Sequence, residues 1–413
     1  MEKEYFTTSL EHMLAELERI DLLFQLHLRM AGQLSAEAPG SRCRAMSSAL
    51  PPKNEIRNAL DEKAGDIWLK KAESKRRGIR LRLDALENLF DLTRIELDIF
   101  LLCLAPELDL LYERICAYLQ NDRTKTRPGV ELVSNMLYPW ISKKQSVSKY
   151  IDAGSPLLKN VLLQLIDDRS GQMVPVNGNY LRVDERIAAY LLELETIDLY
   201  LRPHVWRAGS ESGLEGTNLP SDLKYRLALI GRDRKIFSQG PVMYFQGPEG
   251  MGKQAVAQAL CKQLGLGLLI IDLQSMFTDD RLGFEKALRL IRREAILQHA
   301  ALYWQGFDLL LADDKKTELN ALLLELKEKR GLTFLAGKQA RESAGVLSKF
   351  PFEQIDFPGS DYNEQFESRT KFIGGNLEGI ASTDYRGRQI EFHFSGGQIR
   401  KTSPTIEHEQ MTF

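Results

Sequence analysis

Apolar residues recur every three or four positions through much of the first 200 residues, which is the spacing of amphipathic helices. Thr93, followed three residues later by Glu96, has the spacing of a capping box and predicts a helix that begins at Arg94. Two short extended pieces, at 173–176 and 180–183, predict a small β-hairpin. The helices expected in this half are Ser9–Met30, Arg94–Leu104, Leu108–Gln120, Val130–Leu137, Leu157–Ile166 and Asp184–Leu194.

Prolines and glycines interrupt this helical half. Residues 32–54 contain several of them and few periodic apolar positions, so we expect a linker or loop there. Pro106 predicts a break between two helices at 105–107. Short helices followed by a small hairpin are typical of a winged-helix domain, which binds DNA or protein. Because no basic recognition helix is evident, the pattern favours protein contact.

From Val242 onward, short apolar runs alternate with amphipathic helices. This alternation predicts an α/β domain with a parallel sheet. After the run that begins at Val242, the expected strands are Leu266–Leu273, Ala300–Trp304, Leu332–Ala336 and Gln354–Phe357. The expected helices are Ala255–Leu264, Leu282–Gln298, Thr317–Lys329 and Asn363–Ile373.

The turn after the first of these strands carries a phosphate-loop pattern. Gly247, Gly252 and Lys253 fit the first seven positions of G-x-x-x-x-G-K-[ST]. Glycines let successive N–H groups point at one anion, the following helix adds its positive N-terminus, and the lysine reaches the outer phosphates. We therefore predict an ATP-binding α/β P-loop NTPase domain; a glycine-rich turn that binds nothing is the alternative. The predicted nucleotide-binding residues of the loop are Gly247, Pro248, Glu249, Gly250, Met251, Gly252, Lys253 and Gln254.

The positions that usually bind magnesium and activate water depart from this pattern. Gln254 stands where a Ser or Thr hydroxyl would bind the metal. Gln305 and Gly306 follow the strand at 300–304, where a hydrolysing site has Asp and Glu, and Asp308 is interpreted as structural. One missing group of this kind costs about 10²–10³ in rate. Three such losses predict ATP binding with impaired hydrolysis and a doubtful magnesium site, and we assign no catalytic residue.

Composition narrows the setting and the partners. The 413 residues have a net charge of −2, so no global basic field attracts nucleic acid. The basic run from Lys70 to Arg82 is interpreted as the solvated face of a helix and loop, with nucleic-acid contact as the alternative. Four scattered cysteines lack metal-ligand spacing, the N-terminus is unlike a signal peptide, and no apolar run approaches the ~20 residues of a membrane span. We expect a cytoplasmic protein with no membrane partner.

Several segments resemble known families. The phosphate loop, the strand and turn at 302–310, and the segment Phe394–Arg400 resemble an AAA+ ATPase module. The last is similar to the second sensor motif, which implies that Arg400 reaches the γ-phosphate; a surface arginine is the alternative. Upstream segments resemble the winged-helix region of bacterial AAA+ ATPases that are often encoded with contractile, phage-tail-like injection systems. These segments are Leu104–Asp109, Tyr112–Arg114, Tyr118–Asp122, Arg127–Pro128 and Leu181–Ile187.

This resemblance implies a ring-forming ATPase, homo- or hetero-oligomeric, whose protein partners belong to an injection-system assembly. Members of the family commonly continue into a second ATPase module, whereas this sequence ends at Phe413. We therefore expect either a truncated form or an active partner that supplies hydrolysis. The competing hypotheses are a DNA-binding winged-helix regulator with a nucleotide-sensing domain, and a degenerate fragment without activity. The expected domains are an N-terminal helical region at 1–88, the winged helix at 89–200, a linker at 201–235, the AAA+-like nucleotide-binding domain at 236–360 and a short lid at 361–413.

Overall fold

The chain divides into two compact units, residues 1–199 and 200–413, in a computed structural model. Each unit is described by itself. The residues that the structure describes are 4–34, 50–137, 147–166, 179–209, 242–279, 281–328, 331–338 and 352–357.

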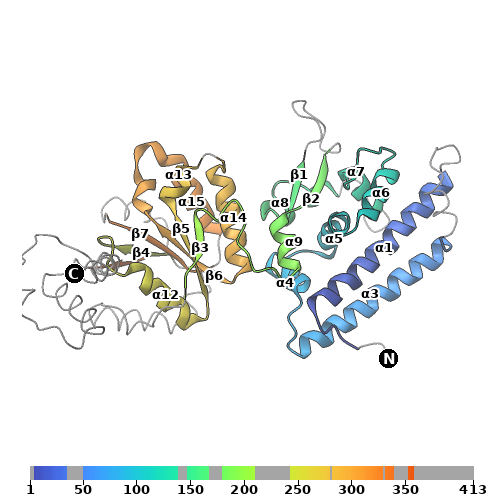
Figure 1. Cartoon of the computed structure of the whole chain (residues 1–413), viewed down its shortest axis with the longest axis horizontal. Helices are drawn as coiled ribbons and strands as arrows, with labels where there is room; N and C mark the ends of the chain where they lie inside the picture. The colour runs from blue at the N-terminus through green and yellow to red at the C-terminus, as the bar shows by residue number, and fades with distance from the viewer. Residues whose placement is uncertain are drawn as a thin grey trace, which may run out of the picture. The chain divides into compact units, whose positions relative to one another are not determined.

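The N-terminal unit is mainly helical and contains one small antiparallel sheet. Its two long helices, α1 (Ser9–Leu34) and α3 (Lys53–Arg76), lie side by side (Figure 1). The α5 helix (Arg94–Leu108) contributes an almost continuous buried stretch to the core, consistent with its apolar sequence. The remaining elements are α4 (Arg82–Leu89), α5 (Arg94–Leu108), α6 (Leu110–Leu119), α7 (Val130–Leu137), η3 (Ser148–Tyr150), α8 (Pro156–Lys159), β1 (Leu163–Ile166), β2 (Tyr180–Val183) and α9 (Glu185–Leu191).

The start of α5 is the capping box that the sequence predicts, but its end is not. The Thr93 hydroxyl accepts a hydrogen bond from the backbone N–H of Glu96, and the Glu96 carboxylate accepts one from the backbone N–H of Thr93. The predicted break at 105–107 is wrong, because α5 runs through Pro106 to Leu108. Proline removes one backbone donor from a helix, and here only Glu107 and Leu108 follow it before α5 ends; Pro106 itself is buried.

The small sheet uses a different first strand from the one predicted. The expected helix over 157–166 ends after Lys159 in α8, and the chain then forms β1. Val161 has a φ of 52°, a left-handed conformation that ends the helix. β1 pairs antiparallel with β2, whose position agrees with the predicted extended piece at 180–183. The other predicted piece, 173–176, lies outside the described residues.

Residues 1–88 and 89–200, expected as separate domains, pack into the same unit. The reason is that α1 packs against α3, α4, α5, α6, α7 and α9, which lie on both sides of the expected boundary at residue 88. Cys103 and Cys116 are buried in this unit. None of the described helices has the length and apolar character needed to cross a membrane.

A six-stranded sheet forms the centre of the C-terminal unit, with the strand order β3-β5-β6-β7-β4-β8. β3 pairs antiparallel with β5, and every other neighbouring pair is parallel. β3 lies inside the expected linker at 201–235, so residues 205–207 of that range belong to the sheet; residues 210–241 lie outside the described part. The strands are β3 (Val205–Arg207), β4 (Val242–Gln246), β5 (Gly267–Asp272), β6 (Ala300–Gln305), β7 (Thr333–Gly337) and β8 (Phe352–Asp356).

Helices cover both faces of this sheet. In Figure 1, α12 lies on one side and α14 and α15 lie on the other. Alternate residues of the strands, such as Met243, Phe245 and Phe334, form one core cluster with Val256 and Leu260 of α12. The helical elements are α12 (Lys253–Leu264), α13 (Leu273–Phe277), α14 (Phe284–Leu297), η6 (Phe307–Leu311), η7 (Asp313–Lys315) and α15 (Lys316–Glu328).

Candidate functional site

The phosphate-loop motif occupies the turn between β4 and α12, at the carboxyl edge of the sheet. Gly247, Gly250 and Gly252 have φ angles of 145°, 78° and 77°. Residues with a side chain rarely adopt such φ angles, so glycine at these positions permits the curled backbone that the motif requires. Loops of this kind present successive N–H groups to one anion.

The N-terminus of α12 reinforces this preference for an anion. Gly252 is the N-cap residue and, because it has no side chain, it cannot cap the first turn of the helix. The first four N–H groups of any α-helix lack intrahelical acceptors, and the helix dipole concentrates positive charge at the same end. A phosphate group is the ligand that suits both properties.

Lys253 points its ammonium group back into the loop. Its Nζ donates hydrogen bonds to the carbonyl oxygens of Gly247, Pro248 at 3.1 Å and Gly337 at 3.4 Å. The residue is only 8% exposed. Burial lowers the pKa of Lys253, whereas the nearby Asp308 carboxylate opposes that shift. The ammonium group of Lys253 therefore lies within the loop, beside carbonyl oxygens.

The base of the loop is fixed by the strands on either side of β4. The Gly247 N–H donates to the Gly337 carbonyl of β7 at 3.1 Å. A Cβ atom at Gly247 would lie 2.4 Å from the carbonyl oxygen of Phe357, which follows β8. The Phe357 N–H in turn donates to the Gln246 carbonyl at 2.7 Å. The first glycine is thus required by packing as well as by its φ angle.

A second lysine, Lys338, reaches the same loop from the end of β7. Its Nζ lies 2.8 Å from Oε1 of Glu249, the third residue of the loop. Its backbone N–H donates to Oδ2 of Asp308 at 2.6 Å. The ion pair with Glu249 raises the pKa of Lys338, and the same pair lowers the pKa of Glu249. The sequence interpretation of Asp308 as structural agrees with this contact, because its carboxylate anchors the backbone beside the loop.

The strand end that would supply a metal-binding carboxylate lacks one. β6 ends at Gln305, and Gly306 follows with a φ of 78°. The parallel register places Gln305 beside Ala336 of β7, so it lies at the same sheet edge as the loop. No cluster of three or more His, Cys, Asp or Glu side chains suited to a metal occurs in the described residues. With Gln254 and Gln305 in place of a hydroxyl and a carboxylate, these residues do not fit a magnesium site.

Arg400, the last predicted nucleotide-binding residue, lies outside the described residues, as does the expected lid at 361–413. The structure instead adds Lys338, which the sequence interpretation missed. Its signal in the sequence is a lysine two residues after the strand predicted at 332–336 in a parallel sheet, since all such strand ends meet at one edge.

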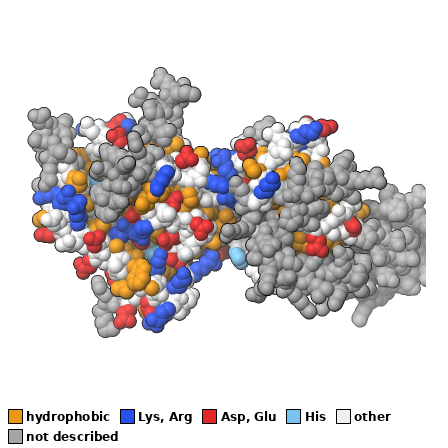
Figure 2. Space-filling view, turned by 180° about the vertical axis from the view of Figure 1, so that it is seen from behind, with side chains coloured by type: hydrophobic (Ala, Val, Ile, Leu, Met, Phe, Trp, Pro, Cys, Tyr) orange, Lys and Arg blue, Asp and Glu red, His pale blue; other side chains and the backbone are white. Residues whose placement is uncertain are grey.

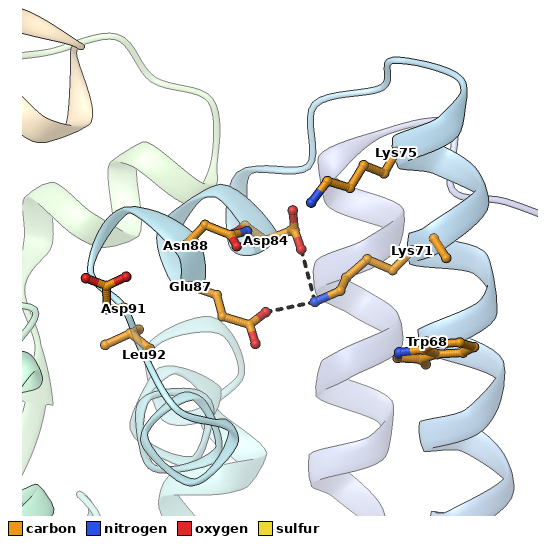
Figure 3. Close-up of a pocket in the computed structure, with 9 residues that line it drawn as sticks. Trp68, Lys71, Lys75, Asp84, Glu87, Asn88, Asp91 and Leu92 are labelled. Atoms are coloured by element: carbon orange, nitrogen blue, oxygen red, sulfur yellow. Dashed lines mark hydrogen bonds and ion pairs between the residues drawn. The ribbon is translucent and has the colours of Figure 1, made fainter. Parts of the chain in front are cut away.

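The N-terminal unit also contains a surface hollow of about 520 Å³. Figure 3 shows that Trp68, Lys71 and Lys75 line it from α3, opposite Asp84, Glu87 and Asn88 of α4. The Lys71 ammonium bridges the carboxylates of Asp84 at 3.0 Å and Glu87 at 2.8 Å. These contacts tie two helices together, so the charged lining is explained by packing.

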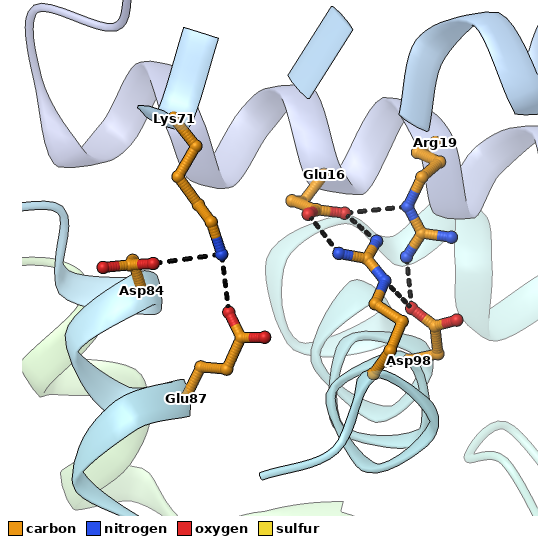
Figure 4. Close-up of polar contacts among 7 residues, drawn as sticks. Glu16, Arg19, Lys71, Asp84, Glu87 and Asp98 are labelled. Atoms are coloured by element: carbon orange, nitrogen blue, oxygen red, sulfur yellow. Dashed lines mark hydrogen bonds and ion pairs between the residues drawn. The ribbon is translucent and has the colours of Figure 1, made fainter. Parts of the chain in front are cut away.

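A buried ion network joins α1 to α5 (Figure 4). The Arg94 guanidinium binds both oxygens of the Glu16 carboxylate, at 2.8 and 2.6 Å. Arg19 donates to Glu16 at 2.8 Å and also contacts Asp98, which Arg94 approaches at 3.2 Å. Burial favours a raised pKa for Glu16, but the two arginines outweigh it and lower the pKa to about 2. Burial raises the pKa of Asp98.

Acidic partners neutralise most of the basic run between Lys70 and Arg82. Lys70 pairs with Asp66, and Glu73 pairs with two neighbouring arginines. Arg82 approaches Glu195 at 3.7 Å. On the face that Figure 2 shows, positive and negative side chains are interspersed over this unit. α7, a helix that precedes the small sheet, contains no lysine or arginine. The run from Lys70 to Arg82 and the α7 helix therefore do not provide the continuous basic stripe of a DNA-binding face.

Comparison with known protein families agrees with the division of the chain into two compact units near residue 200. A protein-family model described as "Winged helix domain, variant" matches residues 1–205. The comparison with curated proteins finds no match.

Solved structures similar to the chain include a katanin structure concerned with self-assembly, at 18% identity and a TM-score of 0.42, covering 54% of this chain and 82% of that one. The FIGL-1 AAA domain has 16% identity and a TM-score of 0.40, covering 54% of this chain and 84% of that one. The same domain in complex with ADP has 18% identity and a TM-score of 0.39, covering 52% and 82%. Because these superpositions are partial, the fold assignment rests on the chain's own strand order and loop geometry. The chain combines a winged-helix domain with an α/β domain of the P-loop NTPase fold.

Proposed function

We propose that this chain is an ATP-binding module of the AAA+ type that hydrolyses ATP slowly or not at all. One contrast carries the proposal. Lys253 and the glycine-rich loop have the geometry of a phosphate cradle. The end of β6, at Gln305 and Gly306, has neither the carboxylate that would position magnesium nor the one that would activate water.

The replaced residues should affect the rate of ATP hydrolysis far more than the affinity for ATP. Binding uses backbone N–H groups, a helix N-terminus and a lysine, and all three are present. Phosphoryl transfer depends mainly on metal and charge placement, and each missing group costs about 10²–10³ in rate. Substitutions at 254, 305 and 306 remove three such groups. The ATPase rate is therefore expected to fall near background while nucleotide binding remains.

The winged-helix domain supplies protein contact in this proposal. Support comes from α7, which has no basic side chain, and from the ion pairs that neutralise the run near Arg82. By the sequence likeness described above, the partners are components of a contractile injection-system assembly in the cytoplasm, and the module joins a homo- or hetero-oligomeric ring. Co-purification of the full chain with those components, and sedimentation with and without ATP, test this part. A salt-sensitive shift of duplex DNA would instead support the regulator hypothesis.

The central test is ATP titration followed by a phosphate-release assay on the same protein. Lys253→Ala should abolish ATP binding, and the wild-type protein should release phosphate at the rate of the buffer control. Lys262→Ala is a matched control, because it removes the same charge from the other end of α12, about 13 Å from Lys253 by helical rise. Magnesium-dependent turnover that Lys253→Ala abolishes would refute impaired hydrolysis. Absence of any ATP binding by the wild type would refute the whole proposal.

A further inference from the structure

The loop faces more negative charge in a bound triphosphate than one lysine neutralises. In most P-loop proteins a magnesium ion bridges the outer phosphates and neutralises part of that charge. The residues at 254, 305 and 306 do not fit such an ion. A nucleotide bound at this loop therefore needs another source of positive charge.

Lys338 is placed to supply it. The hydrogen bond from its backbone N–H to Asp308 fixes its main chain at the end of β7, directly after the Gly337 carbonyl that Lys253 contacts. The Lys338 side chain is flexible and 59% exposed, so its ammonium can move without disturbing the core. The positive charges of Lys338 and Lys253 are close enough that Lys338 contributes to lowering the pKa of Lys253. Two cations thus face one loop, Lys253 from the start of α12 and Lys338 from the end of β7.

The present partner of Lys338 shows which chemistry it accepts. The Glu249 carboxylate, which belongs to the loop itself, binds the ammonium at 2.8 Å. A carboxylate and a phosphate oxygen are both anionic hydrogen-bond acceptors, so a phosphate group can take the place of Glu249. Glu249 also adds a negative charge beside the cradle and thereby competes with the ligand for Lys338.

We propose that Lys338 is a second phosphate-binding cation that takes the place of the metal, so that this loop binds ATP without magnesium, with Glu249 as the competing intramolecular anion. This inference rests on the proposed function, since it concerns the same nucleotide. It assigns Lys338 a role in binding, not in bond cleavage. Both partners of the ion pair are largely exposed, so their substitution leaves the fold intact.

The test is calorimetric titration of the full chain with ATP, once with EDTA and once with saturating magnesium, at equal ionic strength because salt screens these charges. Wild-type affinity should be at least as high in EDTA as in magnesium. Lys338→Gln should weaken ATP binding about tenfold in EDTA, the effect of losing one charge-assisted hydrogen bond to phosphate. Lys338→Arg should retain binding, and Lys262→Gln, at the far end of α12, should leave it unchanged.

Glu249→Gln gives a change of opposite sign. Removing the competing carboxylate should tighten ATP binding about two- to fivefold, the range expected for an exposed ion pair. Binding that requires magnesium, or equal affinities of wild type and Lys338→Gln in EDTA, would overturn the inference and leave the proposed ATP binding standing. Unchanged or weaker binding by Glu249→Gln would overturn the role of that carboxylate. Failure of the wild type to bind ATP under either condition would instead remove the proposed function itself.

Discussion

Replacing Glu16 with glutamine tests the ion network that joins α1 to α5. The substitution preserves the shape of the side chain and removes its charge. Glu16 and Arg19 have side chains that are only 2% and 4% exposed, so solvent screens their interaction little. Arg94 then loses the carboxylate that it binds through two hydrogen bonds, and only Asp98 remains to balance two guanidinium groups.

The pKa shift of Glu16 and the typical cost of breaking a buried ion pair are similar in magnitude. The pKa of Glu16 falls from 4.5 to about 2 on folding, and each pKa unit corresponds to about 1.4 kcal/mol. Glu16→Gln, which resembles the protonated side chain, should therefore lower the free energy of unfolding at neutral pH by about 3 kcal/mol. Removing one partner of a buried ion pair typically costs about 3–5 kcal/mol.

Urea unfolding of the full chain, followed by far-UV circular dichroism, measures this loss, and hydrogen exchange localises it to α1 and α5. The matched control is Glu18→Gln on the same helix; Glu18 is 66% exposed and pairs with Lys63, so the change should cost less than about 1 kcal/mol. Because the folded pKa of Glu16 is lowered, its stabilisation is complete above about pH 4.5 and is lost as pH falls towards about 2. The difference between wild type and Glu16→Gln should shrink over that window. Equal costs for the two substitutions at neutral pH would refute this reasoning.

Two further predictions concern the same unit. Thr93→Ala should lower the free energy of unfolding of this unit by about 1 kcal/mol, because it removes the capping box of α5. Thr93→Ser should retain most of that stability. Urea midpoints of the wild type and the two variants check this, and an alanine variant as stable as the wild type would contradict it. Burial lowers the pKa of His12, so its contribution to stability is complete above pH 6.5 and declines as pH falls below that value. His12→Gln should make the stability less dependent on pH between about 6.5 and 5, and an unchanged dependence in urea titrations would show that His12 is not the responsible group.

The sequence predicts the parts of this fold that depend on local pattern. The apolar runs at β4 to β7 and the helices α12, α14 and α15 follow from periodicity, and the glycines and Lys253 follow from motif spacing. β1 was expected as the end of a helix, because an apolar run as short as Leu163–Ile166 has no distinctive period. β3 is three residues long and exists only through its pairing with β5. Such pairings depend on partners distant in sequence.

In the candidate site, too, some features can be predicted from the local sequence and others depend on contacts between distant segments. The loop and the substitutions at the end of β6 are visible in the sequence, since each lies next to a recognisable strand. The contact between Lys338 and Glu249 is not visible, because it requires β7 to lie beside β4 in the sheet. The packing of residues 1–88 against 89–199 could not be predicted from the sequence either. The ion pair between Glu16 and Arg94 joins helices that are distant in the chain, and no local sequence pattern indicates that they are in contact.

The close approach of Phe357 to Gly247 changes how related sequences should be compared. A side chain at 247 would collide with the backbone after β8, so this glycine would be selected in any descendant that keeps the sheet, with or without a nucleotide. At Gly252 an added Cβ would meet nothing within 4 Å, and only the φ angle of 77° opposes substitution. Retention of Gly247 in homologues therefore indicates that the sheet is conserved, and it does not indicate nucleotide binding. Loss or retention of Lys253 together with Gly252 is the better indicator of whether a homologue binds the proposed nucleotide.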